Sequence, residues 1–146
     1  MADPPVQGKS ALAAISEALV TLHREYYGKG PTKAKTFLMN DTVLCLLHGG
    51  FTVVEKTLIE SGRAEAVHDI RRTFQAAMQE RFTSVVEGAT QRNVIAYMSQ
   101  VHHDPDISAE LFVLEKKEPG KQATESTEFE VQLDGTGSQS RIARPA

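Results

Sequence analysis

Apolar and polar positions follow two different periods along this chain, and the changes of period divide it into helices and strands. From residue 10 to residue 27, apolar side chains recur every three or four positions, which predicts a helix with one buried face. Ser10 is the expected N-cap, and Gly28, Gly30 and Pro31 are expected to end the helix. The predicted buried stripe contains Leu12, Ile15, Leu19, Leu22 and Tyr26.

A hairpin is predicted next. Residues 33–39 and 42–47 are rich in strand-forming side chains, and Asn40-Asp41 between them is typical of a tight turn. The second run is apolar on both faces. This pattern indicates a central strand, covered by helices on one side and by a partner surface on the other.

Two helices should follow Gly49-Gly50. The spacing of Thr52 and Glu55 is that of a capping box, which predicts a short helix to about Ser61, with Glu55 as the capping partner. A long amphipathic helix follows, with Arg71 and Arg72 expected on its solvated face. Its predicted apolar stripe contains Val67, Ile70, Phe74, Met78, Phe82 and Val85.

A second hairpin closes the ordered part of the chain. Residues 94–101 and 107–114 have the composition of strands, and residues 102–106 join them. We therefore expect a disordered N-terminus over residues 1–9 and one domain over residues 10–115. Residues 116–146 are polar and are expected to be mostly disordered, with a weak strand over residues 127–133.

The order of elements predicts an α+β fold made of two α-β-β units. The economical packing is a four-stranded, mostly antiparallel sheet with the helices packed on one face. The uncovered face would then carry apolar residues that a small domain usually buries by self-association, so a homodimer is expected. Depending on the strand register, this face would carry some of Phe37, Met39, Val43, Cys45 and Leu47.

Composition narrows the classes of function. The 146 residues have 40% hydrophobic and 24% charged side chains, as in ordinary soluble domains. The net charge of -3 argues against a nucleic-acid binder. The single cysteine, Cys45, excludes an internal disulfide and is expected to be buried. No signal sequence or membrane-spanning run is evident, so we expect a cytoplasmic protein that does not insert into the membrane and meets it through a partner.

The lysine-rich turn after the first helix is a candidate binding site. Backbone amides near Gly28 and Gly30, together with nearby lysines, would form a small basic nest for an anion. The sequence is not a P-loop, because the spacing differs and a strand follows it. The alternative is a helix end followed by a strand with solvated lysines. The candidate ligand- or partner-binding residues are Tyr27, Lys29, Thr32, Lys33, Lys35 and His48.

The turn of the second hairpin has side chains that can bind metal. His102, His103, Asp104 and Asp106 are the candidate ligands, although adjacent histidines on a strand point to opposite sides. Asp104-Pro105-Asp106 is also ordinary turn chemistry. No nucleophile elbow, Cys-x-x-Cys pair or His-Glu-x-x-His motif is present. We therefore expect no enzymatic activity and no cofactor.

Several stretches resemble one known family. Residues 25–35, which include Tyr-Tyr-Gly-Lys-Gly-Pro-Thr-Lys, are similar to the opening of the MpsC-like family, a domain of unknown function. Residues 46–58, 60–63 and 94–114 fit the same pattern. The resemblance covers about residues 10–115.

The resemblance implies a role in a bacterial membrane-potential-generating system, where relatives accompany membrane components linked to sodium or inorganic-carbon transport. The leading hypothesis is a non-enzymatic, soluble interaction module that acts as an accessory or regulatory component with a membrane-protein partner. One alternative is a sensor that binds a small anion or nucleotide at the turn of residues 29–35. A second alternative is a metal-dependent enzyme that uses the turn of residues 102–106.

Overall fold

The computed structural model describes residues 9–116, 130–133 and 139–143. The order of elements confirms the predicted α+β class and its two α-β-β units. The helices are α1 (Lys9–Tyr27), α2 (Val53–Glu60) and α3 (Ala64–Thr90). The strands are β1 (Lys33–Met39), β2 (Thr42–His48), β3 (Val94–His103), β4 (Asp106–Leu114), β5 (Glu130–Leu133) and β6 (Gln139–Ala143).

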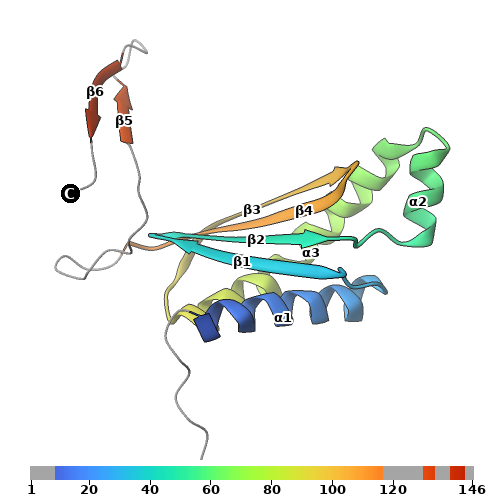
Figure 1. Ribbon diagram of the computed structural model, residues 1–146, viewed down its shortest axis with the longest axis horizontal. Helices are drawn as coiled ribbons and strands as arrows, with labels where there is room; N and C mark the ends of the chain where they lie inside the picture. Colours follow the sequence, from blue (N-terminus) through green and yellow to red (C-terminus); the bar gives the residue numbers. More distant parts are fainter. Residues whose placement is uncertain (1–8, 117–129, 134–138, 144–146) are drawn as a thin grey trace, which may run out of the picture.

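The first four strands form one antiparallel sheet in the order β1-β2-β4-β3. Helices α1 and α3 cover one face of this sheet, while α2 lies beyond the ends of the strands (Figure 1). The two hairpins therefore meet through β2 and β4, which are the central strands. The predicted arrangement of helices on one face is confirmed.

The turn between β1 and β2 follows the sequence closely. Asn40 has a φ of 52°, in the left-handed region that asparagine tolerates better than most residues. The Asp41 carbonyl accepts a hydrogen bond from the Leu114 amide at 2.7 Å, which links this turn to the end of β4. The turn thus fixes both the β1–β2 register and its position against the neighbouring strand.

The core lies between the sheet and the two long helices. Val43, Cys45 and Leu47 of β2 all face the helices and are at most 2% exposed. The uncovered face was expected to carry some of five residues, and it carries two of them, Phe37 and Met39. Because successive side chains alternate across a strand, Leu44 and Leu46 take the uncovered positions on β2.

The helices differ from their predicted stripes at particular positions. Tyr26 is 48% exposed and Ile70 is 54% exposed, so neither belongs to the core. Arg71 is buried instead of solvated, with 5% of its surface exposed, and Gln75 is also buried. Ser10 lies within α1 and is not the residue that precedes it. The buried stripe of α3 contains Val67, Arg71, Gln75, Met78, Phe82 and Val86.

The C-terminal part contains a second, two-stranded antiparallel sheet made of β5 and β6. Strand β5 coincides with the weak strand predicted over residues 127–133. The predicted disorder of residues 1–9 and of the remainder of residues 116–146 concerns positions that lie almost entirely outside the described residues.

Candidate functional site

The turn between α1 and β1 is tied to the end of β2. Gly28 ends α1 with a φ of 87°, a conformation that favours glycine. The Thr32 amide and hydroxyl both donate to the His48 carbonyl, at 2.8 and 3.1 Å. Gly49, with a φ of 72°, follows directly, and a Cβ there would lie 2.5 Å from Thr32 Oγ1. Thr32 therefore holds the backbone in place here.

A buried ion pair lies beside this turn. Arg71 Nε and Nη2 donate to the two carboxylate oxygens of Glu55 at 2.6 and 2.7 Å. The Tyr27 hydroxyl donates to Glu55 Oε2 at 2.5 Å, and its ring lies 4.2 Å from the Arg71 guanidinium carbon. Arg71 Nη2 also donates to the Gly50 carbonyl at 2.8 Å. One carboxylate thus joins α1, the loop before α2, α2 and α3.

The electrostatics of this network favour the ionised pair. Burial would raise the pKa of Glu55, but hydrogen bonds from Arg71, Tyr27 and the Thr52 amide outweigh it and lower that pKa. Burial likewise opposes the charge of Arg71, yet Glu55 raises the pKa of the guanidinium. Burial, with the bond to Glu55, raises the pKa of Tyr27 to about 12.

The predicted capping box is confirmed. The Glu55 carboxylate accepts a hydrogen bond from the Thr52 amide, and the Thr52 hydroxyl accepts one from the Glu55 amide. The ion pair with Arg71 was not predicted. Its signal in the sequence is the spacing, because Arg71 stands four residues after Val67 and four before Gln75 on the buried stripe. A cation on such a stripe needs a buried anion.

The uncovered side of the four-stranded sheet, which we call the open face, contains three of the six predicted binding residues. Lys33, Lys35 and His48 lie on it, but Tyr27, Lys29 and Thr32 do not: Tyr27 points to Glu55, and Lys29 and Thr32 lie in the turn before β1. Cross-strand pairing arranges the open face in four rows. These are Lys33–His48–Ile107–His102, Lys35–Leu46–Ala109–Gln100, Phe37–Leu44–Leu111–Met98 and Met39–Thr42–Val113–Ala96.

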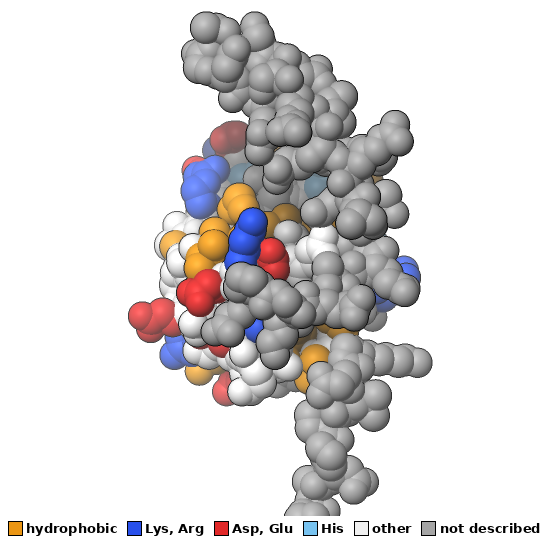
Figure 2. Space-filling model, turned by 90° about the vertical axis from the view of Figure 1, so that its left-hand side faces the viewer, with side chains coloured by type: hydrophobic (Ala, Val, Ile, Leu, Met, Phe, Trp, Pro, Cys, Tyr) orange, Lys and Arg blue, Asp and Glu red, His pale blue; other side chains and the backbone are white. Residues whose placement is uncertain are grey.

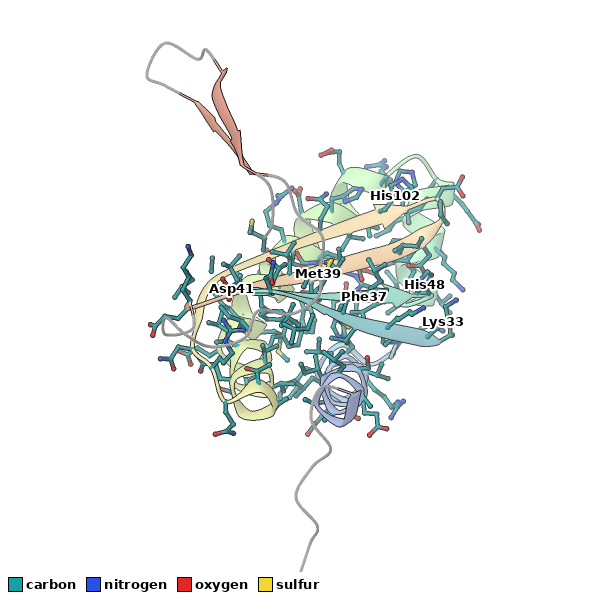
Figure 3. All side chains as sticks on the ribbon, turned by 60° about the vertical axis from the view of Figure 1, so that its left-hand side comes forward. Lys33, Phe37, Met39, Asp41, His48 and His102 are labelled. Carbon is teal, nitrogen blue, oxygen red and sulfur yellow. The ribbon has the colours of Figure 1, made fainter. Side chains whose placement is uncertain are left out.

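Charge is distributed unevenly over the open face. None of the residues in the four rows is Asp or Glu, and the lysines and histidines lie towards one end. In Figure 3, Lys33, His48 and His102 lie at this end, Asp41 lies at the other, and Phe37 and Met39 come between. Lys35 Nζ lies 5.4 Å from the centre of the Phe37 ring. None of the ion pairs among the described residues includes Lys33 or Lys35.

The β3–β4 turn uses its polar groups for local structure. His102 Nδ1 lies 2.8 Å from the Pro105 carbonyl oxygen, and the centres of the His103 and His68 rings are 5.8 Å apart. The Asp106 carboxylate accepts a hydrogen bond from the Phe51 amide, and the Asp106 backbone carbonyl accepts one from the Gly49 amide. Asp104 is exposed. Within the described ranges, no three or more His, Cys, Asp or Glu side chains are grouped so that they could hold a metal ion.

A polar row crosses the buried face of the sheet. Thr36, Cys45, Glu110 and Ser99 are cross-strand neighbours on β1, β2, β4 and β3. The Glu110 carboxylate is fully buried and accepts from the Tyr97 hydroxyl at 2.5 Å and from the Ser99 hydroxyl at 2.7 Å. Burial raises the pKa of Glu110 to about 7, although both hydrogen bonds act in the opposite direction. Glu110 is not among the residues predicted from the sequence.

A shallow groove of about 440 Å³ runs between α1 and β1. It contains none of the predicted site residues. Its lining consists of Ser16, Glu17, Val20, Thr21, Arg24 and Ala34.

A comparison with protein-family models matches residues 8–116 to the family described as "Na+-translocating membrane potential-generating system (MpsC)". The chain belongs to the MpsC family. The match covers all three helices and the four-stranded sheet, and it confirms the resemblance found in the sequence. Neither the comparison with curated proteins nor that with solved structures gave a match. None of the described helices of this MpsC chain is long and apolar enough to span a membrane.

The geometry also explains what the recognisable stretches of this MpsC chain do. Tyr27, Gly50 and Glu55 come from two stretches that are well separated in the sequence. The ring of Tyr27 lies against the Arg71 guanidinium, and Gly50 and Glu55 accept hydrogen bonds from it. Their contacts hold the helices and the loop before α2 together. The open face, in contrast, leaves its apolar side chains without cover from any described helix (Figure 1).

Proposed function

We propose that this MpsC protein is a non-enzymatic interaction module, an accessory or regulatory component of the membrane-potential-generating system after which its family is named. It acts on the cytoplasmic side as a homodimer, with a membrane protein of that system as its partner. The observation that carries the proposal is the open face, which is mostly apolar and has none of the described helices over it. Apolar faces of this kind usually mark contact surfaces.

The polar residues support the same conclusion. Tyr27, Glu55 and Arg71 satisfy one another in a closed network, and Asp106 is engaged by two backbone amides. No described buried side-chain nitrogen or oxygen lacks a hydrogen-bond partner. These groups are therefore accounted for by the fold, and the open face is the feature that the fold leaves unexplained.

Light scattering at micromolar concentration tests the homodimer, with two variants matched in exposure. Met98 lies on the open face and Ile70 lies on α3, and each is 54% exposed. We expect the wild-type protein and Ile70→Lys to be dimers and Met98→Lys to shift to monomer, because a cation would then be buried in the interface. A wild-type monomer would contradict the homodimer.

The accessory role is tested separately in native cells. Tagged wild-type protein should co-purify with membrane components of the system, and loss of the gene should lower the membrane potential reported by a voltage-sensitive dye. If the tagged protein recovers none of those components and the potential is unchanged, the accessory role is wrong.

Anion binding is a second candidate function, favoured by one observation. Lys33 and His48 are direct cross-strand partners, and Lys35 and His102 lie on the same face near them. Inorganic phosphate should then raise the melting temperature of the wild-type protein, and the shift should be smaller for Lys33→Ala than for the α2 variant Lys56→Ala. An equal shift in both variants would remove this candidate.

A further inference from the structure

The uneven charge of the open face specifies how a second copy would pack on it. We propose that two copies stack face to face through their open faces, with the strands of one copy running opposite to the equivalent strands of the other. This inference rests on the homodimer proposed above and adds its geometry. In this arrangement β1 lies over β1 of the second copy, and the Lys33 row lies over the Met39 row.

The size of the face is sufficient for such a dimer. Four strands about 4.8 Å apart and seven residues long, at about 3.4 Å per residue, make a surface of about 19 by 24 Å. Both copies together would bury on the order of 1,000 Å², near the lower end of specific protein interfaces. Two sheets that pack in this way lie about 10 Å apart. The apolar row of each copy, which consists of Phe37, Leu44, Leu111 and Met98, would face the row of Lys35 and Leu46 in the other copy.

Charge decides between the two symmetric ways of stacking. Rotation about an axis parallel to the strands would place β1 over β3 and bring Lys33 of each copy to His102 of the other, so that all the basic groups would gather at one end. The four lysines of the two copies would then lie at the same end of the interface, and repulsion between like charges weakens association. Rotation about an axis perpendicular to the strands avoids this contact.

The perpendicular axis also places the lysines of one copy over the end of the other copy that has no lysine in its rows. Asp41 follows β1 at the far end of the sheet, where it forms an ion pair with Arg92, and Glu115 is exposed after β4. Figure 2 views the molecule from the side on which the β1–β2 turn lies in Figure 1, and both acidic and basic side chains lie beside apolar ones there. Stacking in opposite directions therefore brings the Lys33 end of one copy to the Asp41 end of the other.

The experiment is site-specific cross-linking of the full-length chain with a short bis-maleimide reagent. Cys45 is fully buried and its thiol has a pKa raised by burial to about 11, so it gives little background reaction. Differently tagged Lys33→Cys and Met39→Cys proteins are mixed, unfolded, refolded together and treated. We expect a cross-linked heterodimer from this mixture, and little product from a mixture of Lys33→Cys with His102→Cys.

Charge reversal gives a second readout that does not depend on the reagent. The double variant Lys33→Glu/Lys35→Glu should dissociate at least tenfold more readily than the wild type, while the exposed α2 variant Lys56→Glu should be unchanged. Circular dichroism and the melting temperature show that each variant is folded.

The outcomes separate the geometry from the function. If the protein is a dimer but Lys33→Cys cross-links to His102→Cys, or if neither pair of variants cross-links, the proposed stacking is wrong. The proposed function as an interaction module is not affected by that result. A monomeric wild-type protein, whether its open face is covered by another segment or by another protein, overturns both the stacking and the homodimer. Only a dimer that joins residue 33 to residue 39 and weakens on charge reversal supports the stacking.

Discussion

Arg71 on α3 and Glu55 on α2 form a two-point ion pair that is almost closed to solvent, with side-chain exposures of 6% and 4%. The Tyr27 hydroxyl donates a further hydrogen bond to Glu55, and the Gly50 carbonyl accepts one from Arg71. A buried ion pair stabilises little compared with apolar packing, but losing one partner leaves an uncompensated charge. We therefore expect that α2 keeps its position against α3 only while Arg71 neutralises Glu55.

Replacing Arg71 with alanine should lower the free energy of unfolding by about 3–5 kcal/mol, because the Glu55 carboxylate would stay buried without its cation. Urea denaturation at pH 7 measures this difference. The pKa of Glu55 is lowered, so its stabilising contribution is present above its usual range and is lost as the pH falls through the lowered value. The difference between wild type and variant should accordingly narrow in acid.

The adjacent Arg72 provides a matched control. Its bond to Asp69 is solvent-exposed, with side-chain exposures of 73% and 67%. Arg72→Ala should change the free energy of unfolding by less than about 1 kcal/mol, as exposed pairs do. Equal losses in the two variants would mean that the buried pair is not what holds α2.

The fold was predictable because local signals and global packing agree. Asn40-Asp41 and the Thr52 to Glu55 spacing each specify a local conformation, and the structure contains both. The strand faces were not predictable for β2, since every position from Val43 to Leu47 is apolar. Only pairing with β1 and β4 decides which side of β2 meets the helices.

The buried polar groups were harder to predict for a related reason. Arg71 and Glu110 are both charged, and charged side chains are usually exposed. On β4, Glu110 alternates with Ala109 and Leu111 of the open face, so the apolar residues of this strand do not mark the side that meets the helices. Each is buried because its partners come from distant positions, Glu55 for Arg71, and Tyr97 and Ser99 for Glu110. A hydrophobicity pattern contains no information about such pairs until the strands and helices are packed.

Gly49 should not tolerate a side chain. Its φ of 72° is unfavourable for alanine, and the added Cβ would overlap Thr32 Oγ1. Gly49→Ala should lower the free energy of unfolding by at least about 1 kcal/mol. Gly88 within α3 is the control, since nothing lies near its Cβ position. Gly88→Ala should stabilise by about 0.5–1 kcal/mol in the same thermal or urea unfolding assay, and the opposite signs would be the decisive result.

Cys45 should be unreactive until the protein unfolds. It is fully buried on β2, and burial raises the pKa of its thiol to about 11, so almost no thiolate is present at pH 8. A chromogenic disulfide reagent should modify no thiol in the native protein and one in 6 M guanidinium. Rapid modification of the native protein would show that β2 opens readily, and its rate would measure that opening.

The pH dependence of stability expected from Glu110 is opposite in sign to that expected from Glu55. The folded protein keeps the Glu110 proton up to about pH 7, whereas the unfolded chain loses it near the usual value of 4.5. Between these values the folded state binds more protons, so this residue makes stability fall as the pH rises, and the loss remains above pH 7.

The expected effect is measured by comparing wild type with Glu110→Gln in urea at pH 5 and at pH 8. Glutamine keeps the size of the side chain and still accepts from Tyr97 or Ser99, but it does not ionise. The stability of the wild type relative to the variant should drop by about 2–3 kcal/mol between the two pH values, since one pKa unit corresponds to about 1.4 kcal/mol. The subtraction removes the contributions of Glu55 and the other titrating groups. A difference that stays constant with pH would show that Glu110 is ionised in the folded protein throughout this range, and that its two hydroxyl donors are enough to hold the charge under the sheet.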